Sequence, residues 1–158
     1  MNDSNVINFY STIDAFGAFS NFASYPILMK NQQWPTTEHY FQAQKFDDRA
    51  YQEKIRATKS PMIAARLGRS RKQKLRRDWE SVKIGIMREA VYAKFTQHPE
   101  LTKLLLSTGD ATLVEHTTND SFWGDGGDGS GKNMLGKILM KVREQLKEES
   151  ANAGKTAD

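Results

Sequence analysis

The sequence predicts a helix start in the run Trp34-Pro35-Thr36-Thr37-Glu38-His39-Tyr40-Phe41-Gln42-Ala43-Gln44-Lys45-Phe46. Thr36 can cap free backbone N–H groups, and Glu38 in the first turn suits the positive end of the helix dipole. We expect this helix to run to about Ala57. Glu38, Gln42 and Lys45 recur at i, i+4 and i+7, so they share one polar face. Aromatic residues border this face, which therefore resembles the wall of a pocket.

The rest of the chain predicts a mostly helical α+β fold in a single domain. Short apolar runs favour a small antiparallel sheet near the N-terminus, at 6–10 and 25–29, and a further short strand at 111–117. Apolar residues recur at helical spacing in the segments 62–67, 79–95, 101–105 and 135–146. Strand–helix–strand alternation is missing, which argues against a doubly wound sheet. The expected organisation is a flexible N-terminus, one domain and a disordered tail, at 1–5, 6–147 and 148–158.

Composition excludes several classes of protein. Hydrophobic residues make up 38% of the chain and charged residues 27%, which is typical of a folded domain. The chain has no Cys and three His, so a disulfide framework, a thiolate nucleophile and a structural zinc site are excluded. We expect no metal and no cofactor. Neither a signal peptide nor a long apolar run is present, so we expect a cytoplasmic protein with no membrane partner.

Positive charge is concentrated in one segment. The formal net charge is +4, and no acidic residue interrupts the segment 66–77, which holds seven Lys and Arg. Such a patch favours an anionic partner. The plain alternative, with equal weight, is a solvated helix face. Among anionic partners, a small phosphate ligand is expected before nucleic acid. RNA binding is the weakest reading, because no aromatic residues alternate with the charges.

A glycine-rich segment, 120–133, precedes the last predicted helix. Its five glycines indicate that the backbone comes close to a ligand or to another part of the protein. Lys132 beside a helix start favours an anion site. Gly126 to Lys132 has the spacing of a nucleotide-binding P-loop, but Asn133 replaces the required Ser or Thr. A calcium loop is excluded, because no Glu follows Asp125 and Asp128 at the required spacing. A turn with helix-capping acids remains the plain alternative.

Two carboxylates are candidates for acid–base chemistry. Glu38 and Asp125 each lie beside aromatic residues, with Lys and Arg available for phosphate. Cleavage of a glycosidic bond requires such a set: a carboxylate, an acid for the leaving group, and cations for an anionic substrate. The three histidines stand at no recognisable catalytic spacing from Ser, Cys or acidic partners. Structural or surface roles are therefore expected for His39, His98 and His116.

Several motifs together resemble the YbiA-like proteins of the NADAR superfamily, over roughly residues 6 to 146. The resemblance rests on Phe19-Ser20-Asn21-Phe22, the run 34–46, Ala64-Ala65-Arg66-Leu67-Gly68-Arg69, Leu113-Val114-Glu115-His116-Thr117, Phe122-Trp123-Gly124-Asp125-Gly126 and Gly131-Lys132-Asn133-Met134-Leu135-Gly136. It implies a YbiA-like α+β fold and an N-glycosidase acting on 5-phosphoribosylamino-pyrimidines, early intermediates of riboflavin biosynthesis.

The resemblance also implies roles for individual residues. Glu38 would be the main acid/base, Asp125 the second carboxylate and Trp123 a wall on which the base stacks. Phosphate would be held by Lys45, Arg66 and Lys132, with polar support from Asn21 and Asn133.

Two other functions stay open at this stage. Related members remove ADP-ribose from guanine, so an ADP-ribosyl-guanine or other nucleobase hydrolase is the first alternative. Nucleic acid is not an expected partner, although ADP-ribosylated guanine would be compatible with that activity. A non-catalytic module that binds ADP-ribose or nucleotides is the second alternative. The sequence leaves the oligomeric state open.

Overall fold

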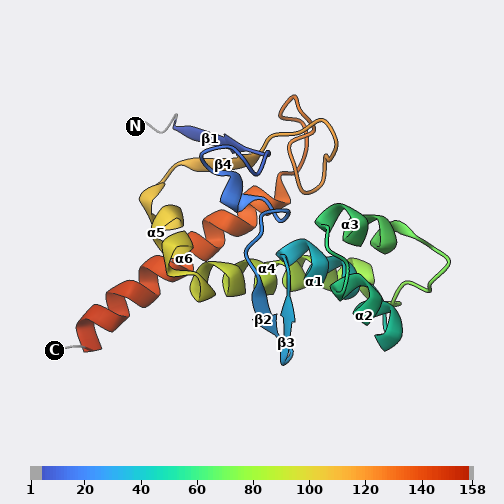
Figure 1. Cartoon of the computed structure of the whole chain (residues 1–158). Helices are drawn as coiled ribbons and strands as arrows, with labels where there is room; N and C mark the ends of the chain where they lie inside the picture. Colours follow the sequence, from blue (N-terminus) through green and yellow to red (C-terminus); the bar gives the residue numbers. More distant parts are fainter. Residues whose placement is uncertain (1–4, 157–158) are drawn as a thin grey trace. The chain divides into compact units, whose positions relative to one another are not determined.

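A computed structural model describes residues 5–156, which form two compact units (Figure 1). One unit comprises Asn21–Gln97, and the other joins residues 5–20 with residues 98–156. Helices dominate and the strands are short. The predicted fold class, mostly helical α+β with a small antiparallel sheet, is confirmed.

The antiparallel sheet is a local hairpin in the unit 21–97. Strand β2 (Ile27–Met29) pairs with β3 (Gln32–Trp34), the segment that follows it directly in the sequence. Lys30 and Asn31 form the turn with φ of 55° and 64°. Two successive residues with positive φ give the twist that a tight hairpin needs. Local pairing therefore takes precedence over the more distant apolar run.

The helix expected from Thr37 to about Ala57 is two helices. Helix α1 (Thr37–Ala43) ends early, and α2 (Arg49–Arg56) begins after Asp48, whose side chain accepts from the Tyr51 N–H at 2.8 Å. Between them Phe46, 1% exposed, forms an isolated bridge with Leu75. A new N-cap and a buried aromatic in extended pairing explain the break, because both compete with continued helix.

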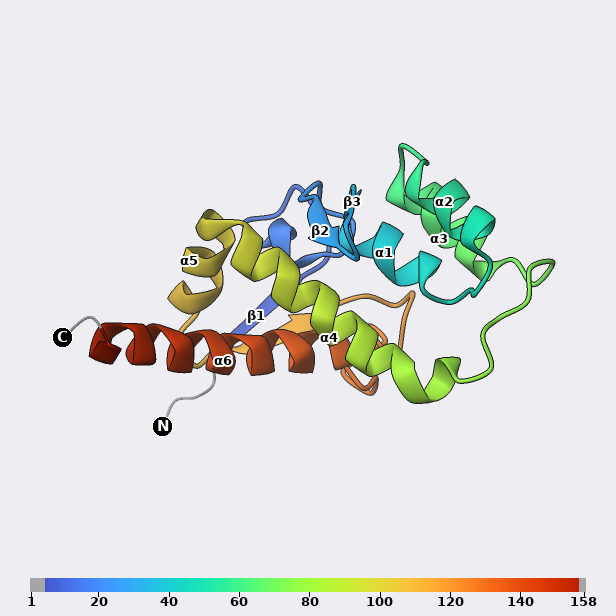
Figure 2. The same cartoon turned by 90° about the horizontal axis from the view of Figure 1, so that it is seen from below.

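Two further helices complete this unit. Helix α3 (Pro61–Arg69) extends past Gly68, where the sequence predicted its end, and packs on α1 (Figure 2). Helix α4 (Trp79–Gln97) follows. The expected core positions Met87, Val91 and Phe95 of α4 are buried, whereas Ile84 is 40% exposed. The core of the unit lies around α1 and includes Ile27, Trp34, Tyr40, Phe46, Ile55, Ala64 and Ala90.

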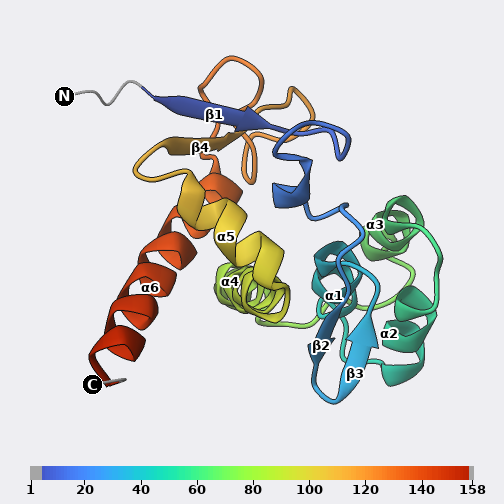
Figure 3. The same cartoon turned by 60° about the vertical axis from the view of Figure 1, so that its left-hand side comes forward.

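The second unit contains a parallel strand pair that the sequence did not predict. Strand β1 (Val6–Phe9) pairs with β4 (Thr112–Glu115), aligning Val6 with Thr112 (Figure 3). A short 3₁₀ helix, η1 (Gly17–Phe19), follows β1. Helix α5 (Pro99–Ser107) contacts α6 (Met134–Thr156), which also packs on β4. The predicted apolar face of α6 is buried at Leu135, Ile138, Leu139, Val142 and Leu146.

Helix α6 continues to Thr156, beyond Lys147, where a disordered tail was expected. Good helix formers such as Glu148, Glu149 and Ala151 extend it without adding to the core. The expected flexible N-terminus falls largely on residues 1–4, which lie outside the described residues. In the described part of the chain, no helix has the length and apolarity needed to cross a bilayer.

Candidate functional site

The start of α1 holds Glu38 in a buried position. Thr36 caps the helix by accepting from the His39 N–H at 3.1 Å. The backbone N–H of Glu38 donates to the Asn21 carbonyl at 3.2 Å, and the Thr37 hydroxyl donates to the Asn21 side-chain oxygen at 2.8 Å. Asn21, itself 8% exposed, therefore anchors the first turn. A carboxylate with 8% exposure sits on this anchored turn.

Gln42 contacts Glu38 from the next turn of the helix. Its Nε2 donates to Glu38 Oε2 at 2.7 Å. Gln42 Oε1 is buried and has no hydrogen-bond partner among the described residues. A Cβ added to Gly68 would lie 1.9 Å from this oxygen, so only glycine lets α3 approach the amide. The sequence placed Gln42 on the face of Glu38 but gave no sign that Gly68 defines its position.

Lys45 stands on the same face, among other cations. Its Nζ lies 3.5 Å from the Gly68 carbonyl. Burial lowers the pKa of Lys45 to about 8; the Arg71, Arg69 and Lys83 charges act in the same direction, and Glu38 opposes them. Mutually repelling cations beside a half-buried ammonium favour a bound anion, which would relieve the repulsion.

The cations near Lys45 differ from those that the sequence picked out. Arg66 is exposed on α3 and is not among the charges that act on Lys45. The cations whose charges act on Lys45 are Arg69, Arg71 and Lys83. Arg69 and Arg71 both belong to the acid-free basic segment, whose role in binding an anion stays a prediction. Which of its members faces Lys45 depends on the end of α3, and the sequence placed that end too early.

Asp125 lies in the other unit and serves as the acceptor for a loop. Its Oδ1 accepts from the N–H groups of Thr117 and Gly127 at 3.0 and 2.8 Å. Its Oδ2 is 2.8 Å from His116 Nδ1. The hydrogen bond with His116, followed by those from Gly127 and Thr117, holds the pKa of Asp125 below its ordinary value despite burial. Asp125 is therefore a firmly ionised carboxylate.

The pairing of His116 with Asp125 was missed by the sequence analysis. The two residues are separated by a loop, and no helix or strand period connects them. Two features of the sequence could have indicated it: His116 lies near the end of a predicted strand, and Asp125 lies beside a glycine-rich turn. A hollow of about 500 Å³ adjoins both residues, and its other lining residues are Val6, Asn8, Val114, Gly127, Asp128, Gly129, Gly131 and Asn133.

The glycine-rich loop closes on itself at the start of α6. The backbone N–H groups from Gly131 to Leu135 each donate to a carbonyl of the segment 121–125, at 2.8 to 3.0 Å. A Cβ at Gly131 would lie 2.6 Å from the Gly124 carbonyl oxygen, so glycine permits this contact. The close approach that the glycines indicated is thus internal. The anion site expected at this helix start is not formed by these N–H groups, because loop carbonyls occupy them.

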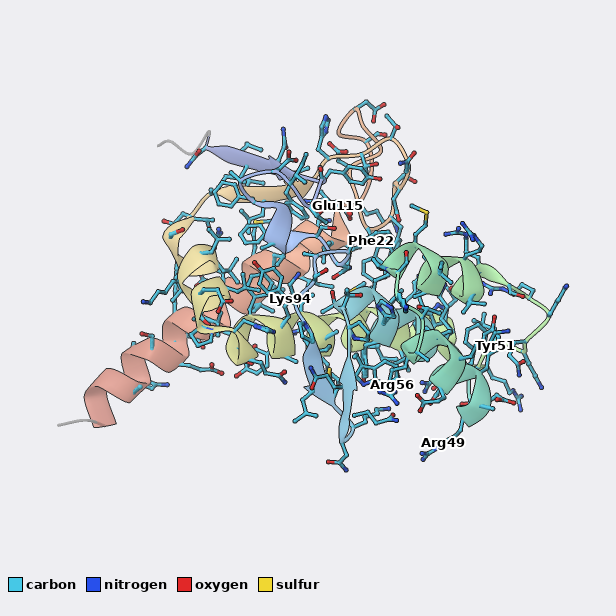
Figure 4. The ribbon with its side chains drawn as sticks, in the orientation of Figure 1. Phe22, Arg49, Tyr51, Arg56, Lys94 and Glu115 are labelled. Atoms are coloured by element: carbon cyan, nitrogen blue, oxygen red, sulfur yellow. The ribbon has the colours of Figure 1, made fainter. Side chains whose placement is uncertain are left out.

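The remaining predicted site residues of this unit lie around the same loop. Lys132 Nζ lies 5.8 Å from the centre of the Phe122 ring, and the Trp123 ring packs edge-on against Phe122. Asn133, at φ 51°, bridges strand β4 by donating to the Leu113 carbonyl and accepting from the Glu115 N–H. These contacts fix the loop on β4, whose last residue is Glu115 (Figure 4). Substrate contacts of Lys132, Trp123 and Asn133 stay predictions.

His39 has the structural role expected for it. Its Nε2 lies 3.0 Å from the Thr58 carbonyl, which can only accept, so Nε2 carries the proton. Nδ1 then accepts from the Thr36 hydroxyl at 2.8 Å. Burial lowers the pKa of His39, in keeping with a neutral ring. Among residues 5–156, no three His, Asp or Glu side chains gather as metal ligands would.

Comparison with known proteins identifies relatives over most of the chain. The NADAR domain family model matches residues 8–147. N-glycosidase YbiA of Escherichia coli (strain K12) is 62% identical over 89% of this chain and 88% of its own length. A riboflavin biosynthesis protein of Vibrio vulnificus is 46% identical, over 91% of this chain and 39% of that protein. The NMR structure of E. coli YbiA superimposes with a TM-score of 0.88 at 58% identity, covering 96% of this chain and 90% of that one.

Proposed function

The chain belongs to the NADAR family and is an N-glycosidase, and from this premise we propose that it hydrolyses the bond between ribose 5-phosphate and an amino-pyrimidine. The observation that carries the proposal is the shared face of Glu38 and Lys45. A buried carboxylate and a cluster of cations lie next to each other, as hydrolysis of a phosphorylated ribosyl compound requires. The name of the Vibrio relative, a riboflavin biosynthesis protein, supports the choice of an amino-pyrimidine as the group that is released.

Glu38 is the acid/base of the proposed reaction. Water adds to the anomeric carbon and the carbon–nitrogen bond breaks. The electron pair of that bond goes to the nitrogen of the leaving amino-pyrimidine, which takes up a proton. Charge builds up on the sugar as an oxocarbenium-like carbon, which a nearby carboxylate stabilises. Gln42 fixes the orientation of Glu38 Oε2, so the carboxylate needs little rearrangement in the transition state.

Phosphate recognition is assigned to Lys45 together with Arg69 and Arg71. Arginine binds phosphate oxygens through two parallel N–H donors, and lysine acts as a point charge. Arg66 and Lys132 are the further phosphate-binding candidates from sequence, with Asn21 and Asn133 as polar supports. Asp125 is assigned as the second carboxylate and Trp123 as the stacking wall. We place the reaction in the cytoplasm and assign it no cofactor and no metal.

The test is incubation of the protein with both substrate classes and mass analysis of the products. Release of ribose 5-phosphate from a 5-phosphoribosylamino-pyrimidine supports the proposal. Release of ADP-ribose alone, from ADP-ribosylated guanine, would replace it by the alternative hydrolase activity.

A further inference from the structure

His116 presents one ring nitrogen for chemistry while the other is held. Asp125 is ionised and can only accept, so His116 Nδ1 carries the proton that joins the two side chains at 2.8 Å. In the neutral ring, Nε2 is then the acceptor. His116 Nε2 makes no hydrogen bond to any residue in the range 5–156. The tautomer therefore leaves an acceptor nitrogen available to a ligand.

Asp125 is itself fixed by the backbone. The two N–H groups on Oδ1 come from Thr117 and from Gly127, which stands at φ 88°. A side chain at residue 127 would meet Thr118 at 2.4 Å, so the loop geometry that aims this N–H depends on glycine. Oδ2 is left for His116. A carboxylate anchored in this way orients an imidazole and stabilises the cation that forms when the ring takes a proton.

The surroundings of the ring do not suit phosphate binding. The His116 side chain is 51% exposed, so packing does not account for its position. It opens on the hollow of about 500 Å³, whose lining includes Asp125 and Asp128 but no Lys or Arg among the described residues. Negative charge in the lining disfavours a bound anion. The hollow therefore accommodates water and uncharged polar groups.

We propose that His116 is a catalytic base of the N-glycosidase reaction, which takes a proton from the attacking water at Nε2, and that Asp125 positions it. The water oxygen bonds to the anomeric carbon and one water proton moves to Nε2. The carbon–nitrogen bond breaks, the leaving nitrogen keeps the electron pair and takes up a proton from solvent, and His116 returns its proton to solvent. The inference rests on the proposed hydrolysis of an N-glycosidic bond. It does not depend on which nitrogenous base is released.

The decisive variants are His116→Gln and Asp125→Asn, with Asp110→Asn as the matched control. Asp110 belongs to the same unit, its side chain is exposed and contacts Lys147, and it does not line the hollow, so this control removes a charge without touching the pair. General base catalysis is worth about 10² to 10⁴ in rate, so His116→Gln should lower kcat by at least about a hundredfold with a much smaller change in KM. Asp125→Asn should lower kcat as well, and Asp110→Asn should keep it.

Two readouts separate catalysis from a structural role. If the His116 ring acts as a general base, kcat/KM should depend on pH, and this dependence should change in His116→Gln. Added imidazole should partly restore His116→Ala. A His116→Gln variant with near-normal kcat and an unchanged pH profile overturns the proposal, whatever its melting temperature. Rates are measured on both substrate classes, so turnover of ADP-ribosylated guanine alone would refute the proposed substrate and still test His116.

Discussion

The Gln42 side-chain amide donates to the Glu38 carboxylate at 2.7 Å, one helical turn away on α1. The same contact leaves Gln42 Oε1 buried without a hydrogen-bond partner among the described residues. An unpaired buried polar atom costs about 1–3 kcal/mol. Such a cost is typical of sites where geometry serves function. The orientation of Glu38 is therefore held at the expense of stability.

Gly68→Ala tests whether this orientation matters. The new Cβ would lie 1.9 Å from Gln42 Oε1 and 2.7 Å from Gln42 Cδ, so the amide must move away from Glu38. We expect kcat to fall about tenfold to a hundredfold, because misplacement of about 1 Å can cost that much in rate. The control is Gly85→Ala on α4, where a Cβ meets nothing within 4 Å. It should raise stability by about 0.5–1 kcal/mol and leave kcat unchanged.

Lys45 predicts a pH dependence of phosphate binding. Its pKa is lowered to about 8, so the ammonium is lost as the pH rises through that value. KM for a phosphorylated substrate should therefore rise above about pH 8, and the rise should be much smaller for the dephosphorylated analogue. Lys45→Met should raise KM for the phosphorylated substrate at pH 7. In this variant, the pH dependence of KM should be the same for the phosphorylated substrate and its dephosphorylated analogue. Parallel pH profiles for the two substrates in the wild type would contradict the assignment.

A buried lysine outside the site predicts a pH dependence of stability. Lys94 on α4 is 1% exposed, and burial lowers its pKa from 10.5 to about 7 (Figure 4). Between these values the unfolded chain binds more protons than the folded one, so the free energy of unfolding should rise with pH from about 7 to 9. One such proton contributes up to about 1.4 kcal/mol per pH unit. Urea titrations of the wild type and Lys94→Met should differ in this slope, and equal slopes would contradict the prediction.

The periodic parts of the fold could be predicted, and the parts closed by single contacts could not. The buried face of α6 and the common face of Glu38, Gln42 and Lys45 follow from helical spacing. The break after Ala43 depends on the cap at Asp48 and on the pairing of Phe46, which helical spacing alone does not reveal. Parallel pairing of β1 with β4 joins segments about a hundred residues apart. Neither strand carries a local signal for its partner.

The same distinction holds for the candidate site. The sequence identified Glu38 and Asp125, because acids beside aromatic residues and glycines are visible in a linear reading. It missed Gly68, which lies against Gln42, and His116, which pairs with Asp125. Gly68 and His116 come from other elements, and loop closure with left-handed glycines brings His116 to Asp125. Contacts of this kind have no fixed spacing, so only coordinates reveal them.

Metal independence is tested by chelation. The chain has no Cys, and the sequence offers no set of His and acidic ligands at metal spacing. We expect full activity after prolonged dialysis against EDTA, since the proposed proton transfers use side chains alone. Activity measured before and after dialysis decides the matter. Loss of activity that zinc or magnesium restores would overturn the expectation.

Glu38→Gln is the most direct test of the proposed reaction. Glutamine keeps the shape of the side chain and loses the ionisable group, and Thr36 still caps the helix. If Glu38 transfers the proton, kcat should fall by at least about a hundredfold while the melting temperature barely changes. The alternative is a first-turn carboxylate that only interacts with the helix dipole, worth about 0.3–1 kcal/mol of stability. Burial of the carboxylate and its bond to Gln42 favour the catalytic role, because a capping acid needs neither.

The two roles differ in which quantity changes, so kcat and thermal stability are measured on the same preparation. Glu38→Asp serves as the control, because it keeps the charge and shortens its reach, and it should lose less activity than the Gln variant only if the charge itself is required. Near-normal kcat in Glu38→Gln with a small loss of stability would leave Glu38 as a helix-stabilising residue. In that case Asp125 and its partner His116 are the next residues to test.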